Sequence, residues 1–451
     1  MERRHFLKVL GGGSLASAVP MVGCRKDAFQ EKAVSLRDIP KGQMTYRTDP
    51  HTGEKISLLG FGCMRFPVKP IGSSDDGEDV IDQEMVNEMF DTALEYGVNY
   101  FDTSPVYCKG RSEHTVGLGL EKHPRESYYL ATKMSNFSPV THPKEASIAM
   151  YHNSMKELRT DYFDYYLVHS VGNMELWQKR FVENGVLDFL LAEKEAGRIR
   201  NLGWSFHGEK EFFDYMMSCG IPWDFVQIQL NYLDWKHATG RNVNAEYLYA
   251  ELEKRNVPAV IMEPLLGGRL ARTNYKAMTM LKSARPEESA ASWAFRFAGS
   301  PPGVLTVLSG MTYMEHLLDN LRTYSPMETV REDEKELLEN VALSMLEFQY
   351  ISCTECDYCM PCPYGLDIPG IFMHYNRCLN ENNLPQNPQD ENYRKARRAF
   401  LVGYDRSIPR LRQANRCIGC DLCLPECPQR IRISEEMFKI SALVERLKQD
   451  A

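Results

Sequence analysis

Between about residues 56 and 325, short apolar runs alternate with longer amphipathic segments. The runs are rich in β-branched and aromatic residues, which is typical of buried strands. The segments between them carry apolar residues at helical spacing, and several stop at glycine, as helices often do. The predicted strands are ISLLGFG, VNYFDTS, YYLATKM, FDYYLVHS, IRNLGWS, DFVQIQLN, PAVIMEP and GVLTVLSG. Clear helical segments span residues 85–97, 144–159, 186–197 and 287–299.

Eight βα repeats over this length predict an α/β fold, a closed (β/α)8 TIM barrel. A doubly wound open sheet is the alternative, but no G-x-G-x-x-G follows the first predicted strand. In a barrel the functional groups lie at the carboxyl ends of the strands.

Ionisable side chains end three neighbouring predicted strands. Asp102 ends the second, with Tyr107 five residues later; Lys133 ends the third and His169 the fourth. A lysine cation beside a tyrosine lowers the phenol pKa, so we expect Asp102 to hold Lys133 and Lys133 to activate Tyr107. His169 would orient a carbonyl oxygen that Tyr107 protonates as a general acid. The alternative is structural: a rim ion pair, a core tyrosine and a histidine that caps a strand.

The segments FDTSPVYCKGRSEHTVGLGL, YYLATKM and LRTDYFDYYLVHS resemble the aldo-keto reductase family. The resemblance implies an oxidoreductase that interconverts a small carbonyl compound and an alcohol with NAD(P)H. It implies that the four residues above form the catalytic tetrad. It also implies that Ser205 and Gln227 contact the nicotinamide, and that the pyrophosphate and adenine lie near Gly310, Thr312 and Asn320.

Three departures concern the nicotinamide cofactor. Phe206 stands where the family usually has asparagine, and Met262 stands where an aromatic residue often stacks on the nicotinamide. The loop after the last strand lacks an Arg or Lys to neutralise a 2'-phosphate, with only Tyr313 and His316 nearby. The choice between NADH and NADPH, and the substrate, stay open.

Two cysteine runs follow the predicted barrel: CTECDYCMPCPYG from Cys353 and CIGCDLCLPECPQR from Cys417. The second has the spacing C-x2-C-x2-C-x3-C-P of bacterial ferredoxins, in which the fourth cysteine often binds the other cluster. We therefore expect two [4Fe-4S] clusters. One would be held by Cys353, Cys356, Cys359 and Cys427, and the other by Cys417, Cys420, Cys423 and Cys362. Tetrahedral zinc is the alternative.

The 54 residues between the runs are helical in pattern, which favours a small helical ferredoxin-like domain. The predicted organisation is a leader (1–30), a barrel (43–326), a helical connector (327–350) and an iron-sulfur domain (351–451). The leader, MERRHFLKVLGGGSLASAVPMVGC, resembles a twin-arginine export signal through Arg3 and Arg4, followed by Phe6. MVGC also resembles a lipobox with Cys24 as the acylated residue. These features predict a periplasmic or membrane-anchored protein, whereas a basic tail is the simpler alternative.

Net charge is −8, and lysines and arginines form no long basic stripe, so a nucleic-acid partner is not expected. Hydride transfer moves two electrons and a cluster moves one. The combination predicts an external one-electron redox partner. The alternative class is an electron-transfer or redox-sensing protein whose barrel only binds a ligand. A third hypothesis gives the clusters a structural role alone.

Overall fold

A computed structural model describes residues 33–69, 80–239, 242–348 and 350–449. Residues 33–451 form one compact unit. The predicted leader, including Arg3, Arg4 and Cys24, lies outside the described residues. No helix of the described ranges is both long enough and apolar enough to cross a membrane.

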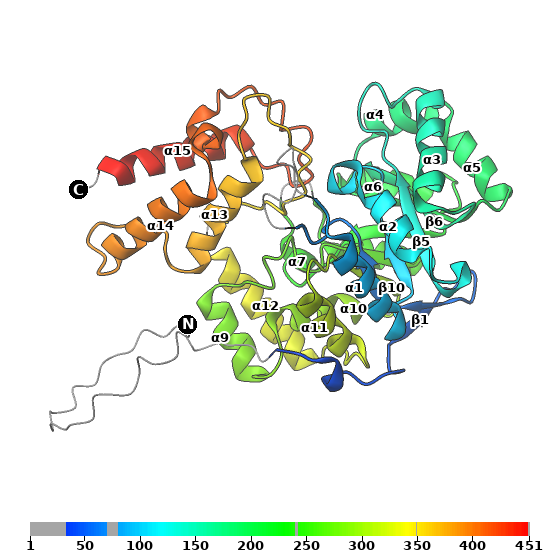
Figure 1. The fold of residues 1–451 in the computed structure, drawn as a ribbon, viewed down its shortest axis with the longest axis horizontal. Coiled ribbons are helices and arrows are strands. Elements are labelled where there is room, and N and C mark those ends of the chain that lie inside the picture. Colours follow the sequence, from blue (N-terminus) through cyan, green and yellow to red (C-terminus); the bar gives the residue numbers. More distant parts are fainter. Residues whose placement is uncertain (1–32, 70–79, 240–241, 349, 450–451) are drawn as a thin grey trace, which may run out of the picture. The chain divides into compact units, whose positions relative to one another are not determined.

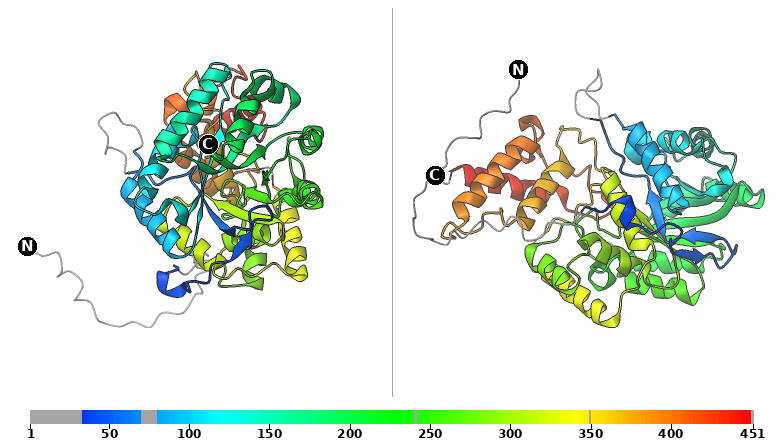
Figure 2. Two further views of the ribbon diagram at one scale, coloured as in Figure 1. Left: turned by 90° about the vertical axis from the view of Figure 1, so that its right-hand side faces the viewer. Right: turned by 60° about the horizontal axis from the view of Figure 1, so that its bottom comes forward.

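Eight parallel strands close into a barrel in the order β10-β3-β4-β5-β6-β7-β8-β9, as the sequence predicts (Figure 1 and Figure 2). The barrel strands are β3 (Leu59–Gly62), β4 (Tyr100–Asp102), β5 (Tyr129–Met134), β6 (Phe163–Val171), β7 (Ile199–Phe206), β8 (Phe225–Gln229), β9 (Ala259–Met262) and β10 (Val304–Ser309). The strands are almost entirely buried, which agrees with their apolar runs; Arg200 of β7 is an exposed exception.

The first predicted strand divides into two elements. Its first part, β2 (Lys55–Ser57), pairs antiparallel with β1 (Tyr46–Thr48), and only β3 enters the barrel. Ser57 causes the break, because its hydroxyl donates to the Leu59 carbonyl at 2.7 Å and its amide donates to Asn99 at 2.8 Å. The hairpin places Ile56 in the interior cluster with Tyr165. It therefore closes the amino end of the barrel and leaves the chemistry to the carboxyl end.

Helices cover the outside of the barrel (Figure 1). They are α1 (Gln83–Glu95), α2 (Ser112–Leu120), α3 (Lys144–Leu158), α4 (Met174–Trp177), α5 (Val186–Glu195), α6 (Lys210–Ser218), α7 (Asp234–His237), α8 (Ala245–Lys254), α9 (Tyr275–Ala284), α10 (Ala290–Gly299) and α11 (Met314–Tyr324). Asp82, Asn274 and Ser289 accept first-turn amide protons and so cap α1, α9 and α10.

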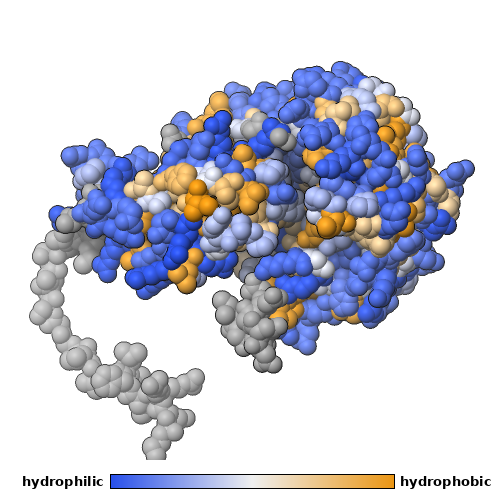
Figure 3. All heavy atoms as spheres, turned by 90° about the horizontal axis from the view of Figure 1, so that it is seen from above, coloured by the Kyte–Doolittle hydropathy of each residue, from blue (hydrophilic) through white to orange (hydrophobic). Residues whose placement is uncertain are grey.

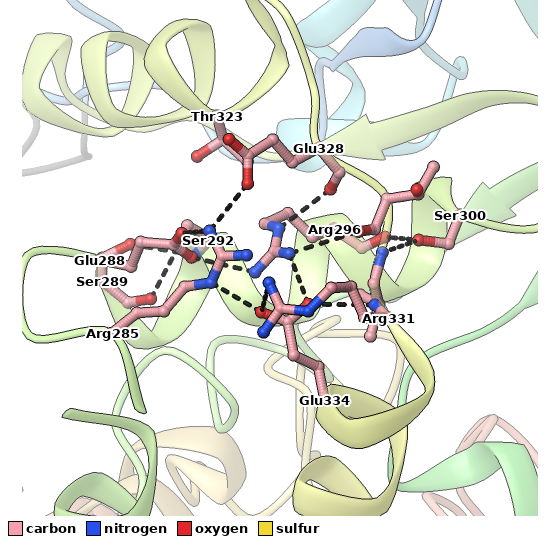
Figure 4. A network of polar contacts seen from close by, with 12 residues as sticks. Arg285, Glu288, Ser289, Ser292, Arg296, Ser300, Thr323, Glu328, Arg331 and Glu334 are labelled. Atoms are coloured by element: carbon pink, nitrogen blue, oxygen red, sulfur yellow. Dashed lines mark hydrogen bonds and ion pairs between the residues drawn. The ribbon is translucent and has the colours of Figure 1, made fainter. Parts of the chain in front are cut away.

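The predicted connector contains α12 (Glu332–Leu346), which packs on the barrel. An ion-pair network joins its first turn to the barrel helices (Figure 4). Glu334, almost fully buried, accepts hydrogen bonds from Arg285 Nε at 2.6 Å and Arg296 Nη2 at 2.8 Å. Burial by itself raises the pKa of Glu334, but hydrogen bonds from the Arg331 amide and from Arg296 outweigh it, so that the pKa is lowered.

The C-terminal part is helical, as the sequence predicts. It consists of α13 (Ile368–Asn380), α14 (Tyr393–Ser407) and α15 (Ile433–Gln449). These helices share an apolar core of their own, against which cysteines of both runs pack. The cysteine runs form the loops before α13 and before α15.

Candidate functional site

The four predicted catalytic residues meet at the carboxyl end of the barrel. Asp102 ends β4, Lys133 lies in β5 and His169 in β6, while Tyr107 begins a short 3-10 helix, Tyr107–Gly110. All four are buried. Lys133 Nζ donates to Asp102 Oδ1 at 2.6 Å and to the Thr103 carbonyl at 2.7 Å, and it lies 4.8 Å from the centre of the Tyr107 ring. The loop geometry thus brings the predicted tetrad together.

The expectation that Lys133 lowers the pKa of Tyr107 is wrong for this structure. Burial raises the pKa of Tyr107 well above 10, and the neighbouring Tyr358 and Asp102 raise it further. Burial also lowers the pKa of Lys133, although the neighbouring Asp102 acts in the opposite direction. Tyr107 is therefore held as a protonated phenol, a proton donor.

His169 is held as a neutral imidazole. Burial lowers its pKa well below 6.5, and the nearby cations Lys133 and Arg180 act in the same direction. Its Nδ1 lies 2.6 Å from Ser135 Oγ, which in turn lies 2.9 Å from Ser104 Oγ. Arg180 donates to the His169 carbonyl at 2.8 Å. These bonds fix the ring and leave Nε2 for a ligand.

The predicted nicotinamide contacts lie on the next two strands. Ser205 ends β7, and its hydroxyl accepts the Ser170 amide at 2.8 Å. Gln227 lies in β8, and its buried Oε1 has no hydrogen-bond partner in the described chain. A buried orphan acceptor costs free energy. An amide donor such as a carboxamide would satisfy it, so these residues fit the nicotinamide group.

The predicted pyrophosphate and adenine contacts lie around β10 and α11. The side chain of Arg65 packs over Gly310, where a Cβ would lie 3.5 Å from Arg65 Cδ. The Thr312 amide donates to His316 Nδ1 at 3.3 Å, and Asn320 Nδ2 is occupied by Ser309 Oγ at 2.7 Å. Asn320 is thus buried, and its side chain is hydrogen-bonded to Ser309 at the end of β10.

The expectation that the loop has only Tyr313 and His316 nearby is incomplete, because Arg272 lies near enough to help lower the pKa of His316, after the larger effect of burial. Arg65 and Arg272 therefore supply cations that the loop sequence itself lacks.

The eight cysteines of the two runs line two cavities. One is lined by Cys353, Cys356, Cys359 and Cys427. The other is lined by Cys362, Cys417, Cys420 and Cys423. These are the groups that the sequence predicts, with the fourth cysteine of each drawn from the other run. Cysteine thiolates are the ligands of iron-sulfur clusters, so each group has the donor set for one cluster.

The two cavities share a wall. Ile368, at the start of α13, and Ile433, at the start of α15, line both. The two cavities are therefore adjacent, with these two apolar side chains between them.

The loop of the first cavity reaches the tetrad. Tyr358, which stands between Cys356 and Cys359, has its ring centroid 5.8 Å from that of Phe137, and Phe137 lies 4.9 Å from the His169 ring. Tyr358 and Tyr107 are close enough that each shifts the pKa of the other. The cysteine loop therefore contributes a second phenol beside that of Tyr107.

Further contacts fix this loop on the barrel rim. Arg65 Nη2 donates to the Thr354 carbonyl. Gly267 has φ +64°, and a Cβ there would lie 2.5 Å from Thr354 Cα, so only glycine allows the two backbones to approach. Gln429, which lines the first cavity, accepts from Asn242 Nδ2 at 2.8 Å and donates to Gln229 Oε1 at 3.3 Å.

Comparison with known proteins agrees with this geometry. The model of the aldo/keto reductase family matches residues 58–339. The chain belongs to the aldo/keto reductase family. A 4Fe-4S dicluster domain model matches residues 352–431, so this reductase also carries an iron-sulfur domain.

Several relatives cover the reductase barrel. L-galactose dehydrogenase of Arabidopsis thaliana is 25% identical over 65% of this chain and 92% of its own. An aldo-keto reductase of Bacillus subtilis is 30% identical over 36% of this chain and 47% of its own. Among solved structures, an aldo-keto reductase from Bacillus halodurans in its holo form aligns with a TM-score of 0.53 at 21% identity, over 66% of this chain and 96% of that one. An aldo-keto reductase from Klebsiella pneumoniae in complex with NADPH aligns with a TM-score of 0.51 at 18% identity, over 66% of this chain and 96% of that one.

Sequence reasoning missed Tyr358, Ser135 and Arg65. Ser135 follows Lys133 at the end of a strand and could have been included by position. The sequence around Tyr358 gives no sign of its contact with Phe137, and the sequence around Arg65 gives none of its bond to Thr354. In both cases the partner is far away in the sequence. Cys108, the neighbour of Tyr107, directs its sulfur to the Met64 carbonyl at 3.3 Å.

Proposed function

We propose that this reductase interconverts a small carbonyl compound and its alcohol at the tetrad, and exchanges the electrons with an external one-electron partner through two [4Fe-4S] clusters. The observation that carries the proposal is the position of Tyr358. It stands between two cysteines of the first cavity and lies beside Tyr107 and Phe137 of the catalytic end. A barrel that worked independently of the cysteine domain would not require this contact.

The residues of the tetrad have distinct roles. Nε2 of the neutral His169 orients the carbonyl oxygen, and the protonated Tyr107 donates its proton to that oxygen during reduction. In the reverse direction the phenolate takes the proton back. Lys133, fixed by Asp102 and the Thr103 carbonyl, stabilises the phenolate formed after donation. Protonation of the carbonyl oxygen thus relies on side chains that are already in place.

Two bound groups would supply the remaining chemistry. Ser205 and Gln227 would hold a nicotinamide, with Gly310, Thr312 and Arg65 near its phosphates, and this group would supply the hydride chemistry. Clusters held by the two cysteine groups carry single electrons. Tyr358, Phe137 and the partition of Ile368 and Ile433 fill the space along this route and exclude water from it.

Anaerobic purification tests the proposal. We expect about eight irons per chain, from two four-iron clusters, and bleaching of the cluster absorption by NADH or NADPH together with a carbonyl-alcohol couple. Eight irons that respond to dithionite but to neither nucleotide would contradict the coupling. Retained ligand affinity without turnover would favour the alternative, a binding barrel in an electron-transfer or redox-sensing protein.

We further propose export by the twin-arginine route, with Cys24 as a lipid anchor. Support comes from Arg3, Arg4 and the MVGC segment. The export route carries folded proteins, which suits a chain with inserted clusters. Replacement of both arginines by lysine is expected to hold the protein in the cytoplasm, and Cys24→Ala to release it from the membrane fraction. An unchanged distribution in both variants would contradict the proposal.

A further inference from the structure

The cysteines that line the second cavity include an exposed member, whereas the four that line the first cavity are each partly buried. Cys420 is exposed, and it is a member of the group that lines this cavity. Tyr358 connects the first cavity to the catalytic end, whereas no hydrogen bond or ion pair joins residues 417–426 to the barrel within the described ranges. The second cavity is therefore the exit of the electron route proposed above.

Large apolar side chains surround this exit. Ile418 is 61% exposed, Leu422 63% and Phe438 50%. Phe438 lies against Gly419, where a Cβ would be 3.3 Å from its ring. We call Ile418, Leu422, Leu424 and Phe438 the apolar collar. Figure 3 views the chain from above and shows apolar residues gathered among hydrophilic ones on the C-terminal part. Apolar side chains grouped in this way at a surface mark an interaction site.

A positively charged segment leads to the collar. Residues 391–416, immediately before Cys417, contain eight Lys or Arg and only two Asp or Glu, in a chain whose net charge is −8. Arg410, Arg412 and Arg416 are exposed and form no ion pair within the described residues. The cysteine run itself carries two exposed acids, Asp421 and Glu426. The positive charge near the collar therefore comes from the three arginines that precede the run.

We propose that the apolar collar and these arginines form the docking surface for an acidic one-electron carrier protein. This inference rests on the proposed function. Small interfaces are typical of transient electron-transfer complexes, and complementary charge steers encounter and sets orientation. When the enzyme oxidises an alcohol to a carbonyl, two electrons and two protons leave the substrate. Two oxidised carrier molecules each accept one electron at this surface, and the protons pass to water.

The test uses the full-length holoprotein, purified anaerobically with its clusters oxidised. It is mixed with a photoreduced acidic plant-type [2Fe-2S] ferredoxin, and bleaching of the cluster absorption gives the rate. The triple variant R410E/R412E/R416E is expected to slow this transfer by about tenfold or more at low salt, and added salt is expected to slow the wild type. The neutral triple R410Q/R412Q/R416Q is expected to give an intermediate rate.

Two controls separate docking from other effects. The triple variant R37E/K55E/K144E makes the same charge change at exposed sites on the barrel unit and is expected to keep the wild-type rate. Methyl viologen radical, which is small and needs no docking surface, is expected to reduce all variants equally. Clusters that accept no electrons from the viologen would contradict the proposed function and not the docking surface.

Three results would overturn the docking proposal. The first is an unchanged ferredoxin rate in R410E/R412E/R416E. The second is reoxidation of the reduced clusters by oxidised cytochrome c, a basic carrier, that is no faster in R410E/R412E/R416E than in the wild type. The third is loss of binding to phosphatidylglycerol-containing vesicles in the triple variant without any change in the ferredoxin rate, which would assign the arginines to a membrane surface.

Discussion

The ring of Tyr358 lies 5.8 Å from the ring of Phe137, although 220 residues separate them in the chain. One belongs to a cysteine loop and the other follows a barrel strand that carries Lys133. Their contact places the first cysteine cavity next to the catalytic end of the reductase.

Replacement of Tyr358 tests that link. We expect Tyr358→Ala to slow electron transfer between substrate and clusters by about tenfold or more, since it removes the ring that joins the two sites and opens the site to water. Anaerobic stopped-flow bleaching measures the rate. Tyr364→Phe, a change near the second cavity at a half-exposed tyrosine, is the matched control. Equal rates in wild type and Tyr358→Ala would remove Tyr358 from the route.

Loss of the Tyr107 hydroxyl is expected to lower the rate of carbonyl reduction by about 10²–10⁴, the usual contribution of a general acid. Steady-state turnover measures it. Tyr166→Phe is the control, because the Tyr166 hydroxyl is also buried but has no hydrogen-bond partner in the described chain. The control is expected to keep full activity. A Tyr107→Phe variant that turns over normally would exclude the proposed acid.

Substitutions at Gly267 and at its neighbour Gly268 distinguish two effects of an added Cβ: a clash with the Thr354 backbone and strain of the residue's own backbone. Both have positive φ, but a Cβ at Gly267 would meet the Thr354 backbone, whereas a Cβ at Gly268 would meet open space. Gly267→Ala is expected to displace the cysteine loop and slow cluster reduction, while Gly268→Ala lowers stability by only about 1 kcal/mol. Cluster reduction by NADPH and thermal melts measure the two effects. The idea fails if both variants reduce their clusters at the same rate.

Glu334→Gln is expected to destabilise the fold by roughly 3–5 kcal/mol, because it leaves the buried guanidinium of Arg296 with less counter-charge. Glu332→Gln, at an exposed pair with Lys335, is expected to cost at most about 1 kcal/mol. The lowered pKa of Glu334 means that its contribution is present above its ordinary pKa and is lost as the pH falls through the lowered value. Thermal melts of both variants at several pH values provide the measurement.

The buried, neutral His169 is expected to lower the free energy of unfolding as the pH falls. Its pKa is lowered in the fold, mainly by burial, so the unfolded chain takes up a proton below about pH 6.5 that the folded chain does not. Stability therefore falls as the pH drops from 7, with a slope of up to about 1.4 kcal/mol per pH unit from this residue. His169→Gln is expected to reduce the slope, and His51→Gln, at an exposed site, to leave it unchanged. A slope that is the same in all three proteins would show that His169 is not responsible.

The sequence predicts the barrel and the tetrad well because both follow from local patterns. Buried parallel strands appear as apolar runs, and Asp102, Lys133 and His169 end such runs. The grouping of the cysteines follows from their spacing. The split of the first strand at Ser57 depends on its bonds to Leu59 and Asn99, which no periodicity shows.

The missed features arise from contacts over long sequence distances. Tyr358 meets Phe137, and Arg65 meets Thr354, only after the C-terminal part has docked on the barrel. The direction of the Tyr107 pKa shift was predicted wrongly for the same reason, since burial under the cysteine loop outweighs the lysine that the local sequence supplies. The sequence could predict that Lys133 and Tyr107 are neighbours, but it could not predict how deeply Tyr107 is buried.

The exchange of the fourth cysteine between the two groups has a consequence for assembly and damage. Neither run can complete a cavity alone, so a cluster bound in either one ties the loop before α13 to the loop before α15 and encloses the helices between them. Each cluster would thus cross-link the two loops, and the two cross-links would depend on each other. Oxidative loss of one would loosen a ligand-bearing loop of the other, so the domain is expected to lose both clusters together and to release Tyr358 from the catalytic end as it does so.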